Sequence, residues 1–420
     1  MKNIEHTKTT PTYVVAVILL LALTYIQFFG SFVIFISLTQ CLIAAFVVLL
    51  VALSFVFINR YNLTSLDKIV LFFFIFTLLS FFYSVEYNGQ SSRGLIPKYL
   101  NYFGILFYFV LKRWRVSSRN TLLIVLIISV SMICCYMFQY FSYPNVYFAD
   151  ANHNVFDDME IFRMRFPCTI CAYLTFMYGL NQYFITNRLS KLLFTILATG
   201  PIIIMEFRTL TILTIVAAIF FTIANNRKSI FKYFKYLVVL SIFGYVALET
   251  PLVQDKIASM IERQSRDDAM DVHNTRFTSV LYHGILFLQE PVGWIIGNGE
   301  PLVGEDGMDD PGNDYQRTMY QAYILDMLWV DTGFWGLSGI IGIPATILLM
   351  SMYYYLIKNC KRKNELFLRY SMFVVMIGSL FTTMEAYRNG NIMILGMLLY
   401  FFSEKRREEE NIISYKKTLK

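Results

Sequence analysis

Charged residues are scarce in this chain of 420 residues: only 15% are charged, while 56% are hydrophobic. Soluble domains usually contain about 25% charged residues, so the composition argues against a soluble globular protein. Apolar stretches of about 20 residues, the length that crosses a bilayer as a helix, recur along most of the chain. The sequence therefore predicts an all-α, polytopic integral membrane protein.

Cysteine pairs, metal-ligand patterns and nucleotide motifs are equally sparse. The six cysteines lie in or beside apolar segments and none lies in the polar stretch 249–321, so no disulfide framework is expected. Cys168 and Cys171 form a CxxC without a second pair or a histidine cluster, which favours packing over metal or redox chemistry. Without an HxxxH or DxD pattern, we expect neither a metal nor another cofactor.

The glycine-rich run GWIIGNG (293–299) is the nearest approach to a nucleotide motif. It lacks the lysine and the Ser/Thr of a Walker loop, and it follows a predicted helix rather than a strand. The run therefore predicts a tight turn that folds the chain back onto the membrane.

The N-terminal segment enters its first apolar stretch without a small-residue cleavage site, which predicts a retained span rather than a signal peptide. Lysine and arginine gather in the short connections, and the positive-inside rule places those connections in the cytoplasm. The net charge of +7 then needs no nucleic-acid partner. About twelve spans satisfy the rule at every connection and leave both termini in the cytoplasm: 12–29, 32–58, 68–84, 97–111, 121–142, 167–186, 190–206, 209–225, 233–248, 334–357, 367–384 and 389–403.

This layout divides the chain into four parts. They are an N-terminal membrane bundle, a large extracytoplasmic loop with short helices, the three C-terminal spans, and a charged cytoplasmic tail: 1–248, 249–333, 334–403 and 404–420. Connections longer than about 12 to 15 residues are usually functional or disordered, and the apolar middle of this loop argues against disorder. We therefore expect the loop to carry function.

Arginines on the predicted outer side are the first candidates for a binding site, because the positive-inside rule disfavours cations there. They include Arg163 and Arg165 in one connection, Arg208 at the head of a span, and Arg276 at the start of a loop helix. Guanidinium grips phosphate through two parallel hydrogen bonds, so these residues suit a diphosphate. The alternative is an ion pair with a nearby carboxylate, such as Glu206 for Arg208.

Two residues are candidates for an acid or base. Asp326 stands among apolar neighbours, a setting that raises the pKa of a carboxyl group. His283 lies two helical turns after Arg276 on the same polar face, and an imidazole titrates near neutral pH. For a carboxylate in this region, such as Asp331, the alternative role is to cap the helix that follows. For a loop histidine, the alternative is exposure to solvent without a role in catalysis.

Three motifs together resemble the O-antigen polymerase and ligase superfamily. They are Arg208-Thr209 at the head of a span, the run NTRFTSVLYHGILFLQEPVGWIIGNG (274–299), and TGFWG (332–336) at the start of the next span. Ligase-like members usually carry a His-Asn pair about eleven residues before the last motif. Ala322 and Tyr323 occupy those positions here, which favours a Wzy-type polymerase.

The resemblance implies glycosyl transfer at the outer face of a bacterial cytoplasmic (inner) membrane, making an O-antigen, capsule or similar surface polysaccharide. It implies a polyprenyl-diphosphate-linked oligosaccharide as substrate, membrane lipid as surroundings and, as a further partner, a chain-length regulator protein. Arg208 and Arg276 would bind the diphosphate with Arg163 or Arg165, and Asp326 or His283 would be the base. A ligase that moves finished glycan to a lipid acceptor and a lipid-linked oligosaccharide flippase stay open as alternatives, although the spans carry few of the charges that a flippase cavity needs.

Overall fold

The computed structural model of the chain describes residues 10–26, 38–142, 145, 147, 153–156, 159–162, 167–204, 208–225, 291–299, 332–380, 386–387 and 390–418. The elements in these ranges are α1 (Thr12–Tyr25), α2 (Leu38–Ile58), α3 (Ser65–Glu86), α4 (Ser92–Phe103), η2 (Gly104–Leu106), α5 (Phe107–Arg113), α6 (Ser118–Ser142), β1 (His153–Phe156), β2 (Met159–Phe162), α7 (Ile170–Thr186), η3 (Leu189–Lys191), α8 (Leu192–Ile204), α9 (Arg208–Asn225), α13 (Pro291–Ile296), α15 (Phe334–Ile341), α16 (Ile343–Asn359), α17 (Leu366–Gly378) and α18 (Asn391–Thr418).

A helix lies in each predicted apolar segment except 233–248, which is outside the described residues. Four of the helical stretches are long and apolar enough to cross a membrane: Thr39–Ile58, Ser65–Glu86, Ser92–Arg113 and Ser118–Ser142. Shorter apolar helices cover Thr12–Tyr25, Leu189–Ile203, Thr209–Asn225 and Leu366–Gly378. The described part of the protein is therefore helical and built from segments of membrane-spanning character.

Several helices differ from the predicted segments. Residues 92–113 form one helical stretch that includes the 3₁₀ turn η2. It begins at Ser92, more than one turn before Pro97, which is the residue where the sequence predicts the start of the span. The predicted span 334–357 is interrupted at Gly342, between α15 and α16. Helix α18 continues through the predicted tail to Thr418, because the charged residues after 403 are themselves good helix formers.

A short antiparallel hairpin is the exception to the predicted all-α fold. Strands β1 and β2 pair His153 with Phe162 and Phe156 with Met159, which leaves 157–158 between the strands. The residues of the two strands include valine, isoleucine and phenylalanine, which favour extended structure. The hairpin falls in the connection 142–166 that the sequence places on the outer side.

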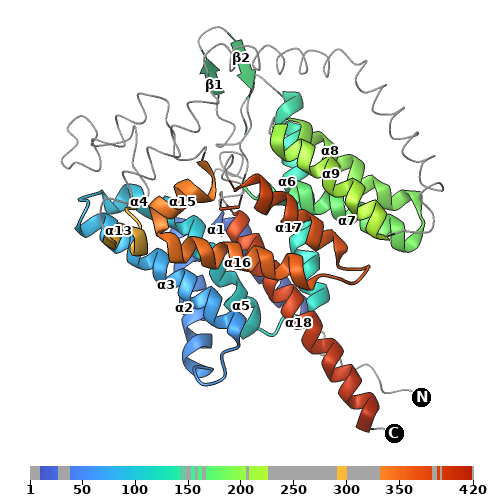
Figure 1. Ribbon diagram of the computed structural model, residues 1–420, viewed down its shortest axis with the longest axis horizontal. Coiled ribbons are helices and arrows are strands. Elements are labelled where there is room, and N and C mark those ends of the chain that lie inside the picture. The colour runs from blue at the N-terminus through green and yellow to red at the C-terminus, as the bar shows by residue number, and fades with distance from the viewer. Residues whose placement is uncertain are drawn as a thin grey trace.

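The helices pack as two adjoining groups (Figure 1). In the first, α2 lies against α5, α3 against α4 and α16, and α18 against α4, η2 and α5. In the second, α7 lies between α6, α8 and α17, and α17 also packs along α9. Helix α18 joins the groups through its contacts with α6 and α7, and its C-terminal half projects beyond the body.

Large apolar side chains cover much of the outside of the bundle, and small polar ones lie within it. Phe46 is 60% exposed, Phe72 50% and Ile212 61%, whereas Thr77 and Ser80 are fully buried. A water-soluble protein rarely exposes so many large apolar groups together. These outward faces are suited to lipid tails, in agreement with the composition.

Ion pairs join the basic connections at one end of the helices. Asp67, which is 1% exposed, accepts hydrogen bonds from Lys112 Nζ at 2.5 and 2.7 Å and from the Tyr108 hydroxyl at 2.8 Å. Glu365, which is fully buried, pairs with Lys405 at 3.1 Å and with Arg406 at 3.0 Å. Some of the connections that are predicted to be cytoplasmic therefore lie side by side, joined by these ion pairs.

Two further contacts extend the same end. The Ser118 backbone N–H donates to Glu408 Oε1 at 3.1 Å, which ties the start of α6 to the C-terminal part of α18. Thr64 and Asp67 form a reciprocal capping box that starts α3, with Thr64 N–H donating to Asp67 Oδ2 at 2.8 Å. Asp67 thus serves both the helix cap and the buried ion pair.

Candidate functional site

Arg208 is the one predicted site residue that lies in the described part of the chain, where it is the first residue of α9. The other predicted site residues lie outside the described residues, and their roles stay predictions: Arg163, Arg165, Arg276, His283 and Asp326.

The head of α9 lies against the end of α17. Leu210, two residues after Arg208, packs so closely on Gly378 that a Cβ added there would lie 2.2 Å from Leu210 Cδ2. Gly378 is the last residue of α17, and Ser379 follows it as the C-cap. The backbone of Arg208 is therefore held near this C-cap.

Ser379 in turn binds the motif TGFWG. The Phe334 N–H donates to the Ser379 carbonyl oxygen at 2.8 Å, and the Ala386 N–H donates to Ser379 Oγ at 2.9 Å. The Tyr387 hydroxyl donates to the Gly333 carbonyl oxygen at 3.1 Å. These bonds place the head of α15 beside the end of α17 and, through Leu210, beside the head of α9.

The run GWIIGNG reaches the other end of α15. The Asn298 N–H donates to the Gly339 carbonyl oxygen at 2.8 Å, and the Gly299 N–H donates to the Ile340 carbonyl oxygen at 3.0 Å. Gly297 has φ +84°, and a Cβ there would lie 2.1 Å from the Ile340 oxygen, so no larger residue fits without a shift. The segment 297–299 is thus a tight turn that folds back onto the helices.

This turn occupies the interruption between α15 and α16. Gly342 has φ +85° and ψ 158°, and a Cβ there would lie 2.2 Å from the Ile295 carbonyl oxygen. Ser80 Oγ donates to the Ile340 carbonyl oxygen at 2.6 Å. Ser80 lies six residues before Glu86, the last residue of α3, so the break lies about 9 Å inside that end of the helix.

Irregular backbone at such a depth needs partners from the protein, because lipid supplies none. Ser80, the 297–299 turn and the C-terminal end of α15 supply them here. In membrane proteins, discontinuous helices of this kind commonly line a binding site.

Helix α3 and the connection that follows it add polar side chains near the turn. The Asn88 side chain donates from Nδ2 to the Asn298 carbonyl oxygen at 2.5 Å. Gln90 is 3% exposed, and neither its amide nitrogen nor its amide oxygen has a hydrogen-bond partner among the described residues. Ser84 is fully buried beside Gly299, and in the described part of the chain its hydroxyl is likewise without a partner. An unpaired buried amide is unfavourable by about 1 to 3 kcal/mol, so Gln90 is suited to binding a polar ligand.

Sequence reasoning missed this polar face of α3. Thr77, Ser80 and Ser84 recur at spacings of three and four residues, which places them along one side of an otherwise apolar helix. That spacing is a signal in the sequence, although it does not reveal which segment the face contacts.

The described residues contain no group of three or more histidines, cysteines or carboxylates that could hold a metal ion. Cys168 and Cys171 are buried free thiols. A Cβ added at Gly390 would lie 2.4 Å from Cys168 Sγ, so this glycine packs directly on the Cys168 thiol. Asn391 accepts at Oδ1 from the Ile170 N–H at 3.0 Å and donates from Nδ2 to Thr169 Oγ1 at 2.9 Å, which ties the starts of α7 and α18 together.

No protein-family model matches the sequence, and no curated protein is significantly similar to it.

Proposed function

We propose that the protein polymerises polyprenyl-diphosphate-linked oligosaccharide repeat units into a surface polysaccharide, an O-antigen or capsule, by glycosyl transfer at the outer face of the bacterial cytoplasmic membrane. An acceptor sugar hydroxyl attacks the anomeric carbon of the growing chain. A C–O bond to the acceptor forms, the C–O bond to the diphosphate breaks, and polyprenyl diphosphate leaves. The proton of the acceptor hydroxyl passes to a base.

One observation supports this proposal above the others. The three motifs that resemble the polymerase and ligase superfamily are far apart in the sequence, yet their described parts meet at one end of the bundle. The head of α9 with Arg208 lies by the C-cap of α17, which binds the head of α15, and the turn 297–299 binds the end of α15. A diphosphate site built from separate loops requires such a meeting.

In the proposed topology, about twelve spans cross the membrane and both termini lie in the cytoplasm. The basic connections form one end of the molecule, with Asp67 bound to Lys112 and Glu365 to Lys405. The turn 297–299 meets α3 near Glu86, at the opposite end of that helix from Asp67. This separation is what the positive-inside rule requires if the turn belongs to the extracytoplasmic loop 249–333.

The leaving diphosphate gains negative charge in the transition state, so fixed guanidinium groups are its natural stabilisers. In this proposal Arg208 and Arg276 bind the diphosphate, with Arg163 and Arg165 as further contacts. Asp326 or His283 accepts the proton. Ser84, which lies beside Gly299, and Gln90, in the connection after α3, offer hydrogen-bonding groups for sugar hydroxyls.

The first experiment deletes the gene and separates the surface polysaccharide by gel electrophoresis. A polymerase defect leaves a single repeat unit on its lipid carrier or acceptor. Long polymer that is never attached to its acceptor would instead identify a ligase, and the absence of any extracytoplasmic repeat unit would identify a flippase. Either of these two results contradicts the proposal.

The second experiment complements the deletion with Arg208→Lys or Arg276→Lys. Lysine keeps the charge and loses the bidentate fork, so we expect polymer synthesis about 10- to 100-fold slower, the loss of one charge-assisted hydrogen bond. Arg119→Lys is the matched control, because Arg119 is exposed at the start of α6 on the opposite end of the bundle. Near-normal rates in both site variants would remove the diphosphate role.

A further inference from the structure

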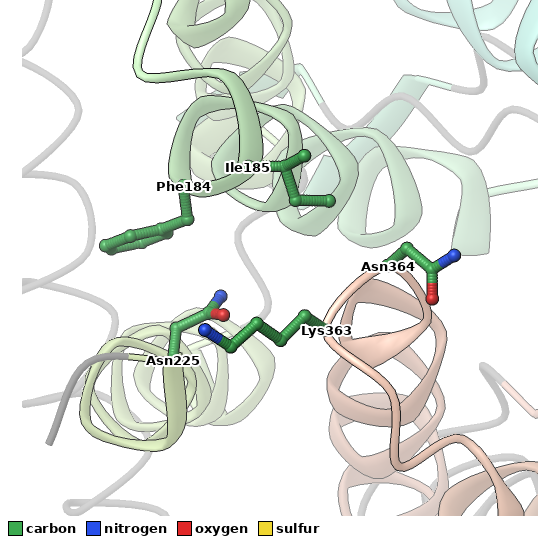
Figure 2. Close-up of a pocket in the computed structure, with 5 residues that line it drawn as sticks. All are labelled: Phe184, Ile185, Asn225, Lys363 and Asn364. Atoms are coloured by element: carbon green, nitrogen blue, oxygen red, sulfur yellow. The ribbon is translucent and has the colours of Figure 1, made fainter.

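A pocket of about 350 Å³ opens at the basic end of the second helix group, away from the candidate site (Figure 2). The ends of α7 and α9 and the connection from α16 to α17 supply its lining: Phe184, Ile185, Asn225, Lys363 and Asn364. Figure 2 shows the Lys363 side chain extending across the pocket toward Asn225, with Phe184 and Ile185 on the facing side.

The polar side of the pocket can donate hydrogen bonds to an anion. The Asn225 Nδ2 atom is buried and has no hydrogen-bond partner within the described ranges. Lys363 is exposed and forms no ion pair with the described residues, and no carboxylate lines the pocket. Glu365 follows closely in the chain, but its carboxylate is fully buried against Lys405 and Arg406. Among the residues that the structure describes, nothing therefore compensates the positive charge of Lys363 in the pocket.

The apolar side continues into the lipid-facing surface. Ile185 is 47% exposed, and on α9 Ile223 is 43% exposed and Phe220 55% exposed. The pocket lies where these apolar faces end, since Thr186 and Asn225 are the last residues of α7 and α9. A molecule bound there would meet a cation and amides at one end and apolar side chains along its length.

We propose that this pocket binds the headgroup phosphate of an anionic glycerophospholipid from the cytoplasmic leaflet. Lys363 pairs with the phosphate, Asn225 and Asn364 donate to its oxygens, and the acyl chains lie against Ile185 and the α9 face. This inference does not depend on the polysaccharide chemistry, because the pocket shares no residue with the candidate site.

A membrane lipid fits these residues better than free phosphate. One lysine near a membrane surface contributes only about 1 kcal/mol toward an anion, too little to hold a small ion from water. Each buried CH₂ group of an acyl chain adds about 0.8 kcal/mol, so a lipid makes up the difference.

The test is native mass spectrometry of the full-length protein released from detergent micelles, with phosphatidylglycerol or phosphatidylcholine added. We expect preferential retention of phosphatidylglycerol, weakened about fivefold in Lys363→Gln, the equivalent of about 1 kcal/mol. Lys361→Gln is the matched control, since Lys361 is exposed in the same connection but does not line the pocket. Equal binding by both variants, or equal retention of the two lipids, would overturn the proposal.

A second variant and a second ligand complete the test. Asn225→Ala removes the unpaired buried donor without adding volume, so it should also lower phosphatidylglycerol retention while the protein stays folded. Inorganic phosphate at millimolar concentration should leave retention unchanged. Displacement of the lipid by inorganic phosphate would contradict the lipid assignment and show a site for a free anion.

Discussion

Gly342→Ala is the sharpest perturbation of the interruption between α15 and α16. With φ +85° and ψ 158°, Gly342 occupies backbone space that is almost restricted to glycine, and an alanine there costs about 1 to 3 kcal/mol in strain. The added Cβ would also lie 2.2 Å from the Ile295 carbonyl oxygen, so α13 must move away.

That movement pulls the adjoining turn with it. The Asn298 and Gly299 N–H groups donate to the carbonyl oxygens of Gly339 and Ile340, and each lost bond is worth about 1 kcal/mol. Together the strain and the two bonds predict a loss of about 3 to 5 kcal/mol from the free energy of unfolding.

The assay is denaturant unfolding of the purified protein in micelles, followed by tryptophan fluorescence. Trp294 and Trp335 lie in α13 and α15, next to the altered contact, and are 44% and 40% exposed, so their emission reports on this region. Gly94→Ala in the first turn of α4, where φ is not positive, should have a small or stabilising effect.

Polymer synthesis is measured in the same variants at matched protein levels. Gly342→Ala should make little polymer, because the 297–299 turn no longer holds its position, and Gly94→Ala should make a normal amount. A free energy of unfolding for Gly342→Ala within about 1 kcal/mol of the wild-type value would refute the reasoning about the interruption.

Three further predictions concern buried polar groups. Gln90→Leu should raise the free energy of unfolding by about 1 to 3 kcal/mol, because it removes an unpaired amide, while polymer synthesis falls about tenfold; unchanged synthesis would exclude a substrate contact. Lys112→Met should lower the free energy of unfolding by about 3 to 5 kcal/mol, because Asp67 is only 1% exposed. Asp67→Asn should lower the free energy of unfolding by less, since Lys112 is 20% exposed and can turn to water. Arg362→Gln, which breaks an exposed ion pair, should lower it by less than about 1 kcal/mol. The reverse order of these free energies in denaturant unfolding would contradict this reasoning. Burial raises the pKa of Glu404 above its ordinary value of 4.5, so the folded protein binds more protons than the unfolded chain, and stability should fall as pH rises from about 4.5 through the raised pKa. Glu404→Gln should flatten this part of a pH–stability curve, and an identical curve in the variant would contradict the assignment.

The positions of the helices could be predicted from the sequence because the signal is local. An apolar run of sufficient length forms a helix wherever lipid surrounds it, and a capping box such as that of Thr64 and Asp67 sets where the helix begins. The apolar run alone does not show the interruption at Gly342, although Pro344, in the first turn of α16, is a local signal for a new helix start. The interruption exists because the turn 297–299 takes over the hydrogen bonds of Gly339 and Ile340.

The residues of the candidate site likewise differ in whether the sequence could identify them. Arg208 could be singled out because a guanidinium at the head of an apolar helix is conspicuous in the sequence. Gln90 could not, because a glutamine in a short connection looks solvated until the fold buries it to 3% exposure. The roles of Arg163, Arg165, Arg276, His283 and Asp326 stay predictions.

The sequence by itself determined the membrane character of the chain, the helical segments and the gathering of lysine and arginine in short connections, since composition and hydrophobic length act residue by residue. Only the tertiary structure decided that the head of α9 lies by the end of α17 and the head of α15, and that the turn 297–299 meets the other end of α15 beside the polar face of α3. Those meetings depend on close packing at Gly378 and Gly342 and on hydrogen bonds between segments far apart in the chain, such as that from Ser80 to Ile340. No single segment encodes such contacts.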